Sequence, residues 1–299
     1  MSRVRYRRTR FSGSMLPTTL INGLFEQSLP VADRGLAYGH GLFETITLQQ
    51  GRPVAWQAHL ERLKAGASRL FIPLADNIEQ TLLADLAILL AKHPSLPERQ
   101  VLKITITRGC GGRGYAVDAG VSINRIVQLN AFPSYPDQPS ANGVAVRLCQ
   151  TRLAIAPQLA GIKHLNRLEQ VLARAEWSTP DIREGLVLDA EGYLVEGTMS
   201  NLFWCRDGVL YTPQLDRCGV KGIIREQIIR LAAQREIPLK EGLFAVDTLY
   251  QADEVFVCNS IIAIWPVIQC TLADQRQSRW SIGPITQCLQ SSLSAEGIY

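Results

Sequence analysis

The sequence lacks the cysteine and histidine patterns that mark disulfide-linked domains and zinc sites. Its seven cysteines are odd in number and widely scattered, without a C-x-x-C pair, and its four histidines show no ligand spacing with them. Disulfide frameworks and zinc sites both require regular pairs of this kind. We therefore expect reduced thiols, a cytoplasmic protein and no bound metal.

Long apolar runs are also missing. No stretch approaches the roughly 18 consecutive apolar residues that a membrane-spanning helix needs, and no apolar core of a secretory signal follows the arginine-rich N-terminus. The overall composition, 46% hydrophobic and 19% charged, is nevertheless typical of a globular chain. We expect a protein that does not bind membranes, with room for about two domains.

The basic character of the chain is confined to its N-terminus. The net charge is +4, but residues 1–14 hold five of the 31 basic residues and no acid, so 26 basic residues remain against 27 acidic ones. Such a tail could bind nucleic acid, although it carries no aromatic platform or helical stripe. We expect residues 1–15 to form a disordered basic extension without a nucleic-acid partner, and Met15 is an alternative start.

Hydrophobic patterning predicts two α/β parts separated by a proline-rich segment. Alternating or β-rich runs predict strands, and apolar residues at helical spacing predict helices. In the first part, strands are expected within 16–27, 41–51, 99–109 and 121–131, and helices within 55–70 and 77–93. In the second part, we expect strands at 143–149, 254–260 and 263–269, a hairpin at 185–205 and a helix at 222–234.

Three prolines mark the boundary between these parts. Pro133, Pro136 and Pro139 recur within seven residues, where they should exclude both a helix and an interior strand. We predict a two-domain α/β (α+β) fold. The smaller N-terminal domain spans 16–131, the linker 132–142 and the larger C-terminal domain 143–299.

A glycine-rich stretch resembles a nucleotide-binding motif but lacks its context. "GCGGRG" at 109–114 fits G-x-G-x-x-G, yet the residues that follow read as a loop and a strand, whereas a dinucleotide fold requires a helix there. We therefore reject a dinucleotide site. Arg113 at the centre of the loop could instead close over an anionic small molecule.

A second glycine-rich stretch is a better candidate for binding an anion. In "GVKGIIREQIIRLAAQ", the apolar residues predict a helix that begins near Gly222, and the first amides of a helix have no intrahelical acceptors. Those amides and the helix dipole can bind a phosphate, which Gly219 and Gly222 would allow to approach the backbone. The alternative is that these glycines only shape a loop.

Lys163 is one of six lysines and lies in a loop before a predicted helix. Asn166 and Glu169 fit the N-cap and N3 positions of that helix, and its apolar face is expected to contain Leu168, Val171, Leu172 and Ala175. A lysine becomes a nucleophile toward carbonyls when burial or a neighbouring cation lowers its pKa. Spacing alone leaves both a catalytic role and a solvated loop residue open.

Several motifs in order resemble the fold-type IV pyridoxal-phosphate enzymes. These are "ADRGLAYGHGLFETI" and "HLERL" in the first half, then "GIKHLNRLEQ", "EGLVLDAEGYLVEGTMSNLFW", "GVKGIIRE" and "ADEVFVCNS" followed by "PV". The family includes branched-chain and D-amino-acid transaminases and aminodeoxychorismate lyase. The resemblance covers roughly residues 20–270 and implies a pyridoxal 5'-phosphate cofactor, a small-molecule substrate and a homodimer.

Carried over residue by residue, the resemblance assigns a cofactor site. It implies that Lys163 holds the cofactor covalently and later takes a proton from the substrate, while Glu196 bonds the protonated ring nitrogen. The remaining cofactor-binding positions implied are Arg62, the amides of Ile223 and Ile224, Ser260 and Asn201.

The lyase branch of the family fits better than the transaminases. "TRGCGGRGY" and "GIKHLNRLEQ" resemble the lyase, which forms p-aminobenzoate and pyruvate for folate synthesis, whereas Glu44 directly before Thr45 is at least as similar to transaminases. A transaminase therefore stays the alternative. The resemblance suggests Thr45 as a proton donor to the leaving group. Arg113, Arg108 and Tyr38 are expected to bind the substrate, from the same chain or across a dimer interface.

Overall fold

The computed structural model describes residues 18–26, 28–93, 95, 97–118, 120–271 and 277–298. The predicted basic extension 1–15 lies outside these ranges. The first part of the chain forms one antiparallel sheet in the order β1-β5-β4-β2-β3. Its strands are β1 (Thr19–Ile21), β2 (Gly41–Gln49), β3 (Arg52–Pro53), β4 (Arg99–Thr107) and β5 (Asn124–Ala131).

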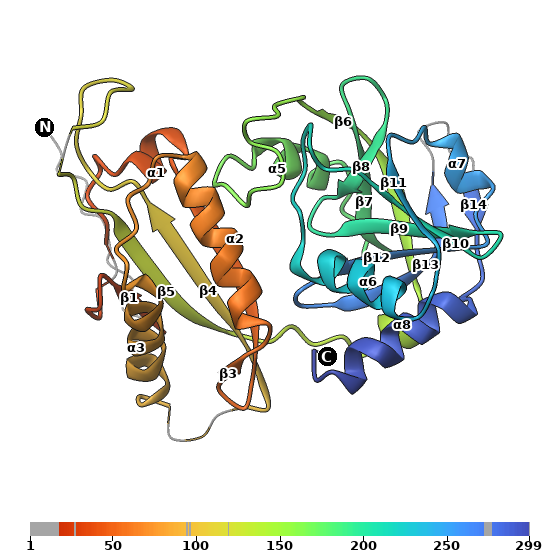
Figure 1. Cartoon of the computed structure of the whole chain (residues 1–299), viewed down its shortest axis with the longest axis horizontal. Helices are drawn as coiled ribbons and strands as arrows, with labels where there is room; N and C mark the ends of the chain where they lie inside the picture. The colour runs from red at the N-terminus through yellow and green to blue at the C-terminus, as the bar shows by residue number, and fades with distance from the viewer. Residues whose placement is uncertain are drawn as a thin grey trace, which may run out of the picture.

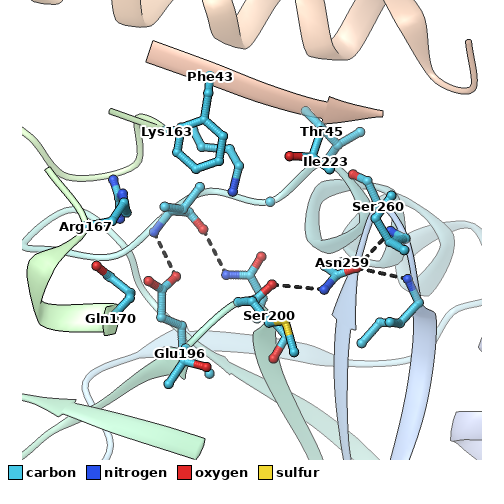
Figure 2. Close-up of a pocket in the computed structure, with 18 of the residues that line it drawn as sticks. Phe43, Thr45, Lys163, Arg167, Gln170, Glu196, Ser200, Ile223, Asn259 and Ser260 are labelled. Carbon is cyan, nitrogen blue, oxygen red and sulfur yellow. Dashed lines mark hydrogen bonds between the residues drawn. The ribbon is translucent and has the colours of Figure 1, made fainter. Parts of the chain in front are cut away.

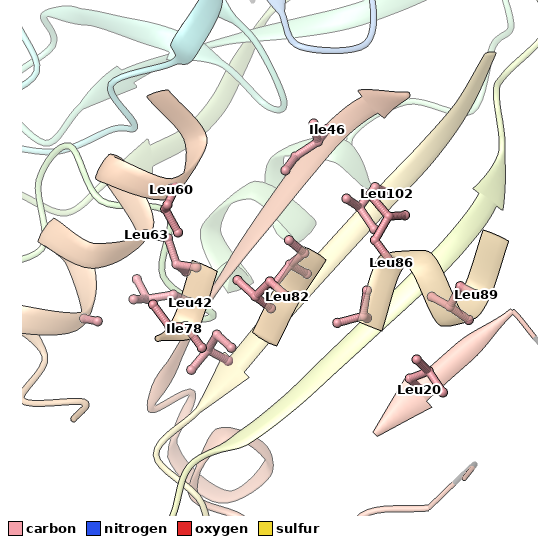
Figure 3. Close-up of a cluster of buried hydrophobic side chains, with 14 of the residues drawn as sticks. Leu20, Leu42, Ile46, Leu60, Leu63, Ile78, Leu82, Leu86, Leu89 and Leu102 are labelled. Carbon is pink, nitrogen blue, oxygen red and sulfur yellow. The ribbon is translucent and has the colours of Figure 1, made fainter. Parts of the chain in front are cut away.

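Two amphipathic helices cover one face of this sheet (Figures 1 and 3). They are α2 (Trp56–Arg69) and α3 (Ile78–Leu90), as the helical spacing predicts. Leu60 and Leu63 from α2 and Leu82 from α3 pack on Ile46 and Leu102 of the sheet. A five-residue helix, α1 (Arg34–Tyr38), was not predicted, because only the Asp33 side chain that caps its amides marks it in the sequence.

Two adjacent leucines on α3 offer a matched test of this core. Leu82 is 1% exposed and Leu83 is 38% exposed. We expect Leu82→Ala to lower the free energy of unfolding by about 2–5 kcal/mol, because it leaves a cavity in a packed core. Leu83→Ala should change it by less than about 1 kcal/mol. Denaturant unfolding of the two variants, followed by circular dichroism, measures the difference, and equal losses would contradict this packing.

The connecting segment differs from the sequence prediction in one respect. Residues 139–142 form a short helix, α4 (Pro139–Asn142), although the prolines were expected to exclude one. Pro139 stands in the first turn of this helix, where backbone N–H groups have no intrahelical acceptor. A proline there costs the helix no hydrogen bond. Tyr135 packs edge-on against Trp265, with 4.8 Å between the ring centroids. This contact holds the connecting segment against the second part of the chain. We propose that it separates domains 16–131 and 143–299.

The second part of the chain forms a mixed sheet that closes on itself. The order is β11-β10-β9-β12-β13-β6-β7-β8, with β14 on β13, and β8 pairs again with β9 through Glu196 and Asn201. The strands are β6 (Val144–Leu153), β7 (Ile182–Asp189), β8 (Leu194–Gly197), β9 (Asn201–Arg206), β10 (Val209–Pro213), β11 (Leu239–Gly242), β12 (Glu254–Asn259), β13 (Ala263–Thr271) and β14 (Gln277–Arg279). The helices of this part are α5 (Leu168–Arg174), α6 (Ile223–Gln234), α7 (Asp247–Tyr250) and α8 (Pro284–Ala295).

Alternating side chains give this sheet two apolar faces. On β12, Val255 and Val257 belong to one buried cluster, whereas Phe256 and Cys258 belong to another that includes α6 and α8. This is the two-residue period of a strand that is covered on both sides. No helix among the described residues is long and apolar enough to cross a bilayer.

Candidate active site

A cavity of about 670 Å³ lies between the two parts of the chain. Phe43 and Thr45 of β2 line it from one side, and Lys163, Glu196 and Ile223 line it from the other (Figure 2). Most of the residues predicted for the site therefore meet in one place. They are Lys163, Thr45, Glu196, Arg62, Ile223, Ser260 and Asn201.

The loop that carries Lys163 is fixed by backbone bonds to β2. The Phe43 amide donates to the Lys163 carbonyl at 3.0 Å, and the Leu165 amide donates to the Gly41 carbonyl at 3.0 Å. Lys163 thus enters the cavity at the junction of the two sheets. Its ammonium nitrogen lies 4.4 Å from the centroid of the Phe43 ring.

The surroundings of Lys163 favour its uncharged form. Burial, reinforced by the guanidinium groups of Arg62 and Arg167, lowers the pKa of Lys163 to about 8, and the carboxylates of Glu44 and Glu196 only partly oppose this. Burial disfavours the charged ammonium, and nearby positive charge does the same. A substantial share of neutral amine near neutral pH is the property that a carbonyl nucleophile needs.

Glu196 and Asn201 hold the segment that begins helix α6. The Val220 amide donates to Glu196 Oε2 at 2.9 Å, and Asn201 Nδ2 donates to the Val220 carbonyl at 2.8 Å. Gly222 is required beside them, because a Cβ there would lie 2.0 Å from Asn201 Oδ1. The pair that closes the second sheet therefore also positions the start of this helix.

Glu196 is buried without a salt-bridge partner among the described residues. Burial raises the pKa of Glu196 to about 7, although the Val220 amide and the positive charges of Arg167 and Lys163 act in the opposite direction. A carboxylate of this kind gains strongly from any protonated nitrogen brought against it, because such a partner replaces lost hydration.

The other end of the cavity is suited to an anion. Helix α6 begins after Gly222 without a side-chain cap, so the amides of Ile223 and Ile224 stand in its first turn. Arg62 reaches the same end from α2, where its Nη1 donates to the Lys221 carbonyl at 2.9 Å, and Ser260 lines the cavity nearby. Free amides, the helix dipole and a guanidinium together form an anion site.

A buried carboxylate that sequence reasoning missed holds another wall of the cavity. Glu184 accepts bonds from the amides of Gly185, Thr198 and Met199 and from the hydroxyls of Thr198 and Ser200. The turn at 198–200 lines the cavity. In the sequence, Glu184 is only one acid at the start of a strand, and nothing marks it as the centre of this turn.

The three predicted substrate residues lie elsewhere. None of the three lines the cavity. Arg113 and Tyr38 are exposed. Arg108 is buried, and its Nη1 donates to the Val121 carbonyl. Residues 109–114 lie in the connection from β4 to β5, whose described residues form no helix, so the prediction of a loop followed by a strand is confirmed. Buried Arg34 holds this loop through the carbonyls of Gly111, Gly114, Tyr115 and Ala116.

The predicted helix after Lys163 is confirmed as α5, but the predicted N-cap is wrong. Helix α5 begins at Leu168, its N-cap position is Arg167, and no side chain caps it. The Asn166 side chain lies instead against Gly39, where a Cβ would come within 1.9 Å of Asn166 Oδ1. Glu169 accepts from the Ala154 amide. Both predicted capping groups therefore contact other segments and do not cap α5.

The predicted apolar face of α5 is also not buried. Leu168, Val171 and Leu172 are 76%, 59% and 61% exposed. Hydrophobic periodicity identified the stripe correctly, but the stripe faces away from the core of this chain. An exposed apolar stripe of this size is typical of a protein interface.

Further residues of the cavity escaped prediction because they belong to common residue types. Arg167, whose pKa is lowered by burial, is held by bonds from its Nε to the His164 carbonyl and from its Nη2 to the Ile162 carbonyl. Gln170 lies beside it with a buried Oε1 that has no partner in the described chain. The only signal for either was position, since both follow Lys163 closely.

The residues that line the cavity fit pyridoxal phosphate. No group of three acidic, histidine or cysteine side chains among the described residues could hold a metal ion. The cavity instead offers a low-pKa amine, a lone buried carboxylate and an anion-binding helix end. An aldehyde, a ring nitrogen and a phosphate are the respective partners for these three groups.

The family model for amino-transferase class IV matches residues 41–270. The chain belongs to the class IV aminotransferase family. An aminodeoxychorismate lyase from Vibrio harveyi is 36% identical over 276 residues, which cover 92% of this chain and 98% of the relative.

Two solved class IV structures share the fold. The 4-amino-4-deoxychorismate lyase from Pseudomonas aeruginosa matches with a TM-score of 0.85 and 42% identity, covering 94% of this chain and 100% of that one. The branched-chain amino acid aminotransferase from Escherichia coli matches with a TM-score of 0.79 and 25% identity, covering 94% of each chain.

Proposed function

We propose that this protein is a pyridoxal-phosphate-dependent 4-amino-4-deoxychorismate lyase, which forms p-aminobenzoate and pyruvate. The observation that carries the proposal is the meeting of Lys163, Glu196 and the first turn of α6 in one cavity. The similarity to two aminodeoxychorismate lyases over more than nine tenths of the chain supports the choice of reaction.

In this proposal, each group at the cavity holds one part of the cofactor. Lys163 would bind its aldehyde carbon, and Glu196 would bond its ring nitrogen. Arg62, Ser260 and the amides of Ile223 and Ile224 hold its phosphate, while Asn201 fixes the segment that presents those amides. When bound, the cofactor supplies a protonated ring that accepts the electron pair released from the carbon bearing the substrate amine.

The residues of the chain then move the protons. Once the substrate amine has replaced it, the free amine of Lys163, with a pKa near 8, would take the proton from C4 of the substrate ring, which is general-base catalysis by a positioned amine. The C–O bond to the enolpyruvyl group breaks as the ring becomes aromatic. Thr45 faces the cavity from β2 and is the proposed proton donor to the departing group.

We further propose that the protein works as a homodimer in the cytoplasm. The exposed stripe of Leu168, Val171 and Leu172 supports an interface. The predicted substrate residues on the 109–114 loop and α1 lie away from the cavity of their own chain, which supports a contribution of Arg113 to the site of the second subunit. The seven free cysteines agree with a reducing compartment.

Product analysis tests the proposed reaction against its alternative. With 4-amino-4-deoxychorismate as the substrate, we expect one pyruvate for each p-aminobenzoate, measured by lactate dehydrogenase coupling and fluorescence. A branched-chain or D-amino-acid transaminase would instead transfer the amine of an amino acid to 2-oxoglutarate and form no p-aminobenzoate. Amine transfer without p-aminobenzoate would contradict the proposal.

A further inference from the structure

The acid that precedes Thr45 points away from the cavity. On β2, Phe43 and Thr45 line the cavity, whereas Glu44 faces helix α2 and is 2% exposed. Alternate residues of a strand point to opposite faces, so Glu44 cannot join Thr45 against the substrate. Its similarity to transaminases therefore says nothing about the substrate, and its role must be found behind the cavity wall.

The Glu44 carboxylate accepts two hydrogen bonds from the guanidinium of Arg62. Arg62 Nε donates to Glu44 Oε1 at 2.9 Å, and Arg62 Nη2 donates to Glu44 Oε2 at 2.5 Å. A paired contact of this kind fixes the plane of the guanidinium as well as its position. With the bond to the Lys221 carbonyl, three of the five N–H groups of Arg62 are used, and the residue still lines the cavity.

His59 extends the same cluster to the other part of the chain. His59 Nδ1 lies 2.6 Å from Glu44 Oε2, and His59 Nε2 lies 3.4 Å from the Ser260 hydroxyl. The Ser260 carbonyl in turn accepts from the Thr47 hydroxyl at 2.6 Å. Glu44 therefore touches both Arg62 and the histidine that contacts Ser260, and these are the two side chains proposed for the phosphate.

We propose that Glu44 and His59 are positioning residues that orient Arg62 and Ser260 toward the phosphate of the cofactor. Burial alone would raise the pKa of Glu44, but the charge of Arg62 and the hydrogen bond with His59 lower it to about 2. Glu44 therefore stays charged and can hold the Arg62 guanidinium in place. A carboxylate that stays charged keeps the guanidinium oriented before the anion arrives. This inference rests on the proposed function, because it assumes that Arg62 and Ser260 bind the phosphate.

The test compares the cofactor with and without its phosphate. The full chain, freed of cofactor, is titrated with pyridoxal phosphate and with pyridoxal, and tryptophan fluorescence reports binding. For Glu44→Gln, we expect roughly a 10–100-fold loss of affinity for pyridoxal phosphate, as for outer partners of other ligand-binding groups. Affinity for pyridoxal should change less than about twofold, because its aldehyde and ring contacts remain.

Two further variants complete the design. Glu61→Gln is the matched control, because Glu61 is an exposed acid on the same helix whose side chain bonds only Gln57 in the described structure. His59→Gln is expected to show the same selective loss with a smaller size, and it decides the matter if Glu44→Gln does not fold. At saturating pyridoxal phosphate, kcat of both positioning variants should return to within about threefold of the wild-type value.

The outcomes separate this inference from the proposed function. If Glu44→Gln binds pyridoxal phosphate as well as the wild type or better, Glu44 does not position Arg62 for the phosphate and the inference fails. Equal losses for pyridoxal and pyridoxal phosphate would also overturn it, because they indicate general damage to the site. If the wild-type chain binds neither compound, the proposed function itself fails.

Discussion

Replacing Lys163 with alanine is expected to abolish turnover of 4-amino-4-deoxychorismate. The variant loses the group that binds the cofactor aldehyde and also the base that takes the C4 proton. We expect a loss of at least roughly 10⁴-fold in kcat, because general-base catalysis alone contributes about 10²–10⁴-fold and nucleophilic binding adds to it. Release of p-aminobenzoate, followed by fluorescence with the substrate in excess, measures the effect.

The matched control is Lys64→Ala. Lys64 is exposed on α2 and takes no part in the cavity, so its removal should leave kcat within about twofold. The alanine variant at 163 should also fold normally, since it removes a group whose charge the fold disfavours. Turnover by Lys163→Ala within tenfold of the wild type would show that another residue carries the chemistry.

Glu196→Gln is expected to cause the second largest loss of activity. A glutamine cannot keep the ring nitrogen protonated, so the electron pair released from the substrate is less well stabilised. We expect kcat to fall roughly 10²–10³-fold, which is the usual size for one preorganised electrostatic group. The same fluorescence assay measures the loss, with Glu98→Gln, an exposed acid after α3, as the control.

The same substitution should stabilise the cofactor-free protein at alkaline pH. The pKa of Glu196 is about 7 in the folded chain because burial raises it, against 4.5 for an ordinary glutamate. The folded state therefore binds this proton more tightly than the unfolded state, so stability falls as the pH rises from 4.5 through 7. Above that range, the buried charge costs on the order of 3 kcal/mol.

Thermal unfolding of both cofactor-free proteins tests this sign. Glu196→Gln should have the higher Tm at pH 8, and its advantage over the wild type should disappear near pH 4.5. Such a residue is typical of a functional site, where a group is kept for its chemistry at the expense of stability. An equal or lower Tm of the variant at pH 8 would mean that burial does not disfavour the charged form of Glu196.

Local patterns in the sequence predicted most of the framework. The helices α2 and α6 follow from apolar residues at helical spacing, and residues such as Ile228 and Leu231 are buried as that spacing requires. The first turn of α6 follows from Gly222 and the apolar run after it. Lys163 and Glu196, in contrast, look ordinary in the sequence, and only the order of motifs around them suggested a shared site.

The remaining errors involve contacts between distant segments. Asn166 has the sequence context of a helix cap, but the Gly39 turn beside it takes its side chain, and no local pattern contains that contact. Glu44 was noted in the sequence only for its similarity to transaminases, and its contact with Arg62, which joins β2 to α2, was not predicted. Contacts between distant segments decide both positions. The exposed Asn166 side chain packs against Gly39, whereas the buried Glu44 carboxylate needs hydrogen-bond donors and finds them on Arg62 and His59.

The central claim is that one amine, Lys163, is uncharged enough near neutral pH to bind the cofactor aldehyde. Borohydride reduction of the protein with pyridoxal phosphate at pH values from 6 to 11, followed by peptide mapping, tests it directly. We predict that the cofactor is attached to Lys163 and that the yield rises with a midpoint near pH 8, the pKa set mainly by burial. Attachment to another lysine, or a midpoint near the 10.5 of an ordinary lysine, would contradict the account.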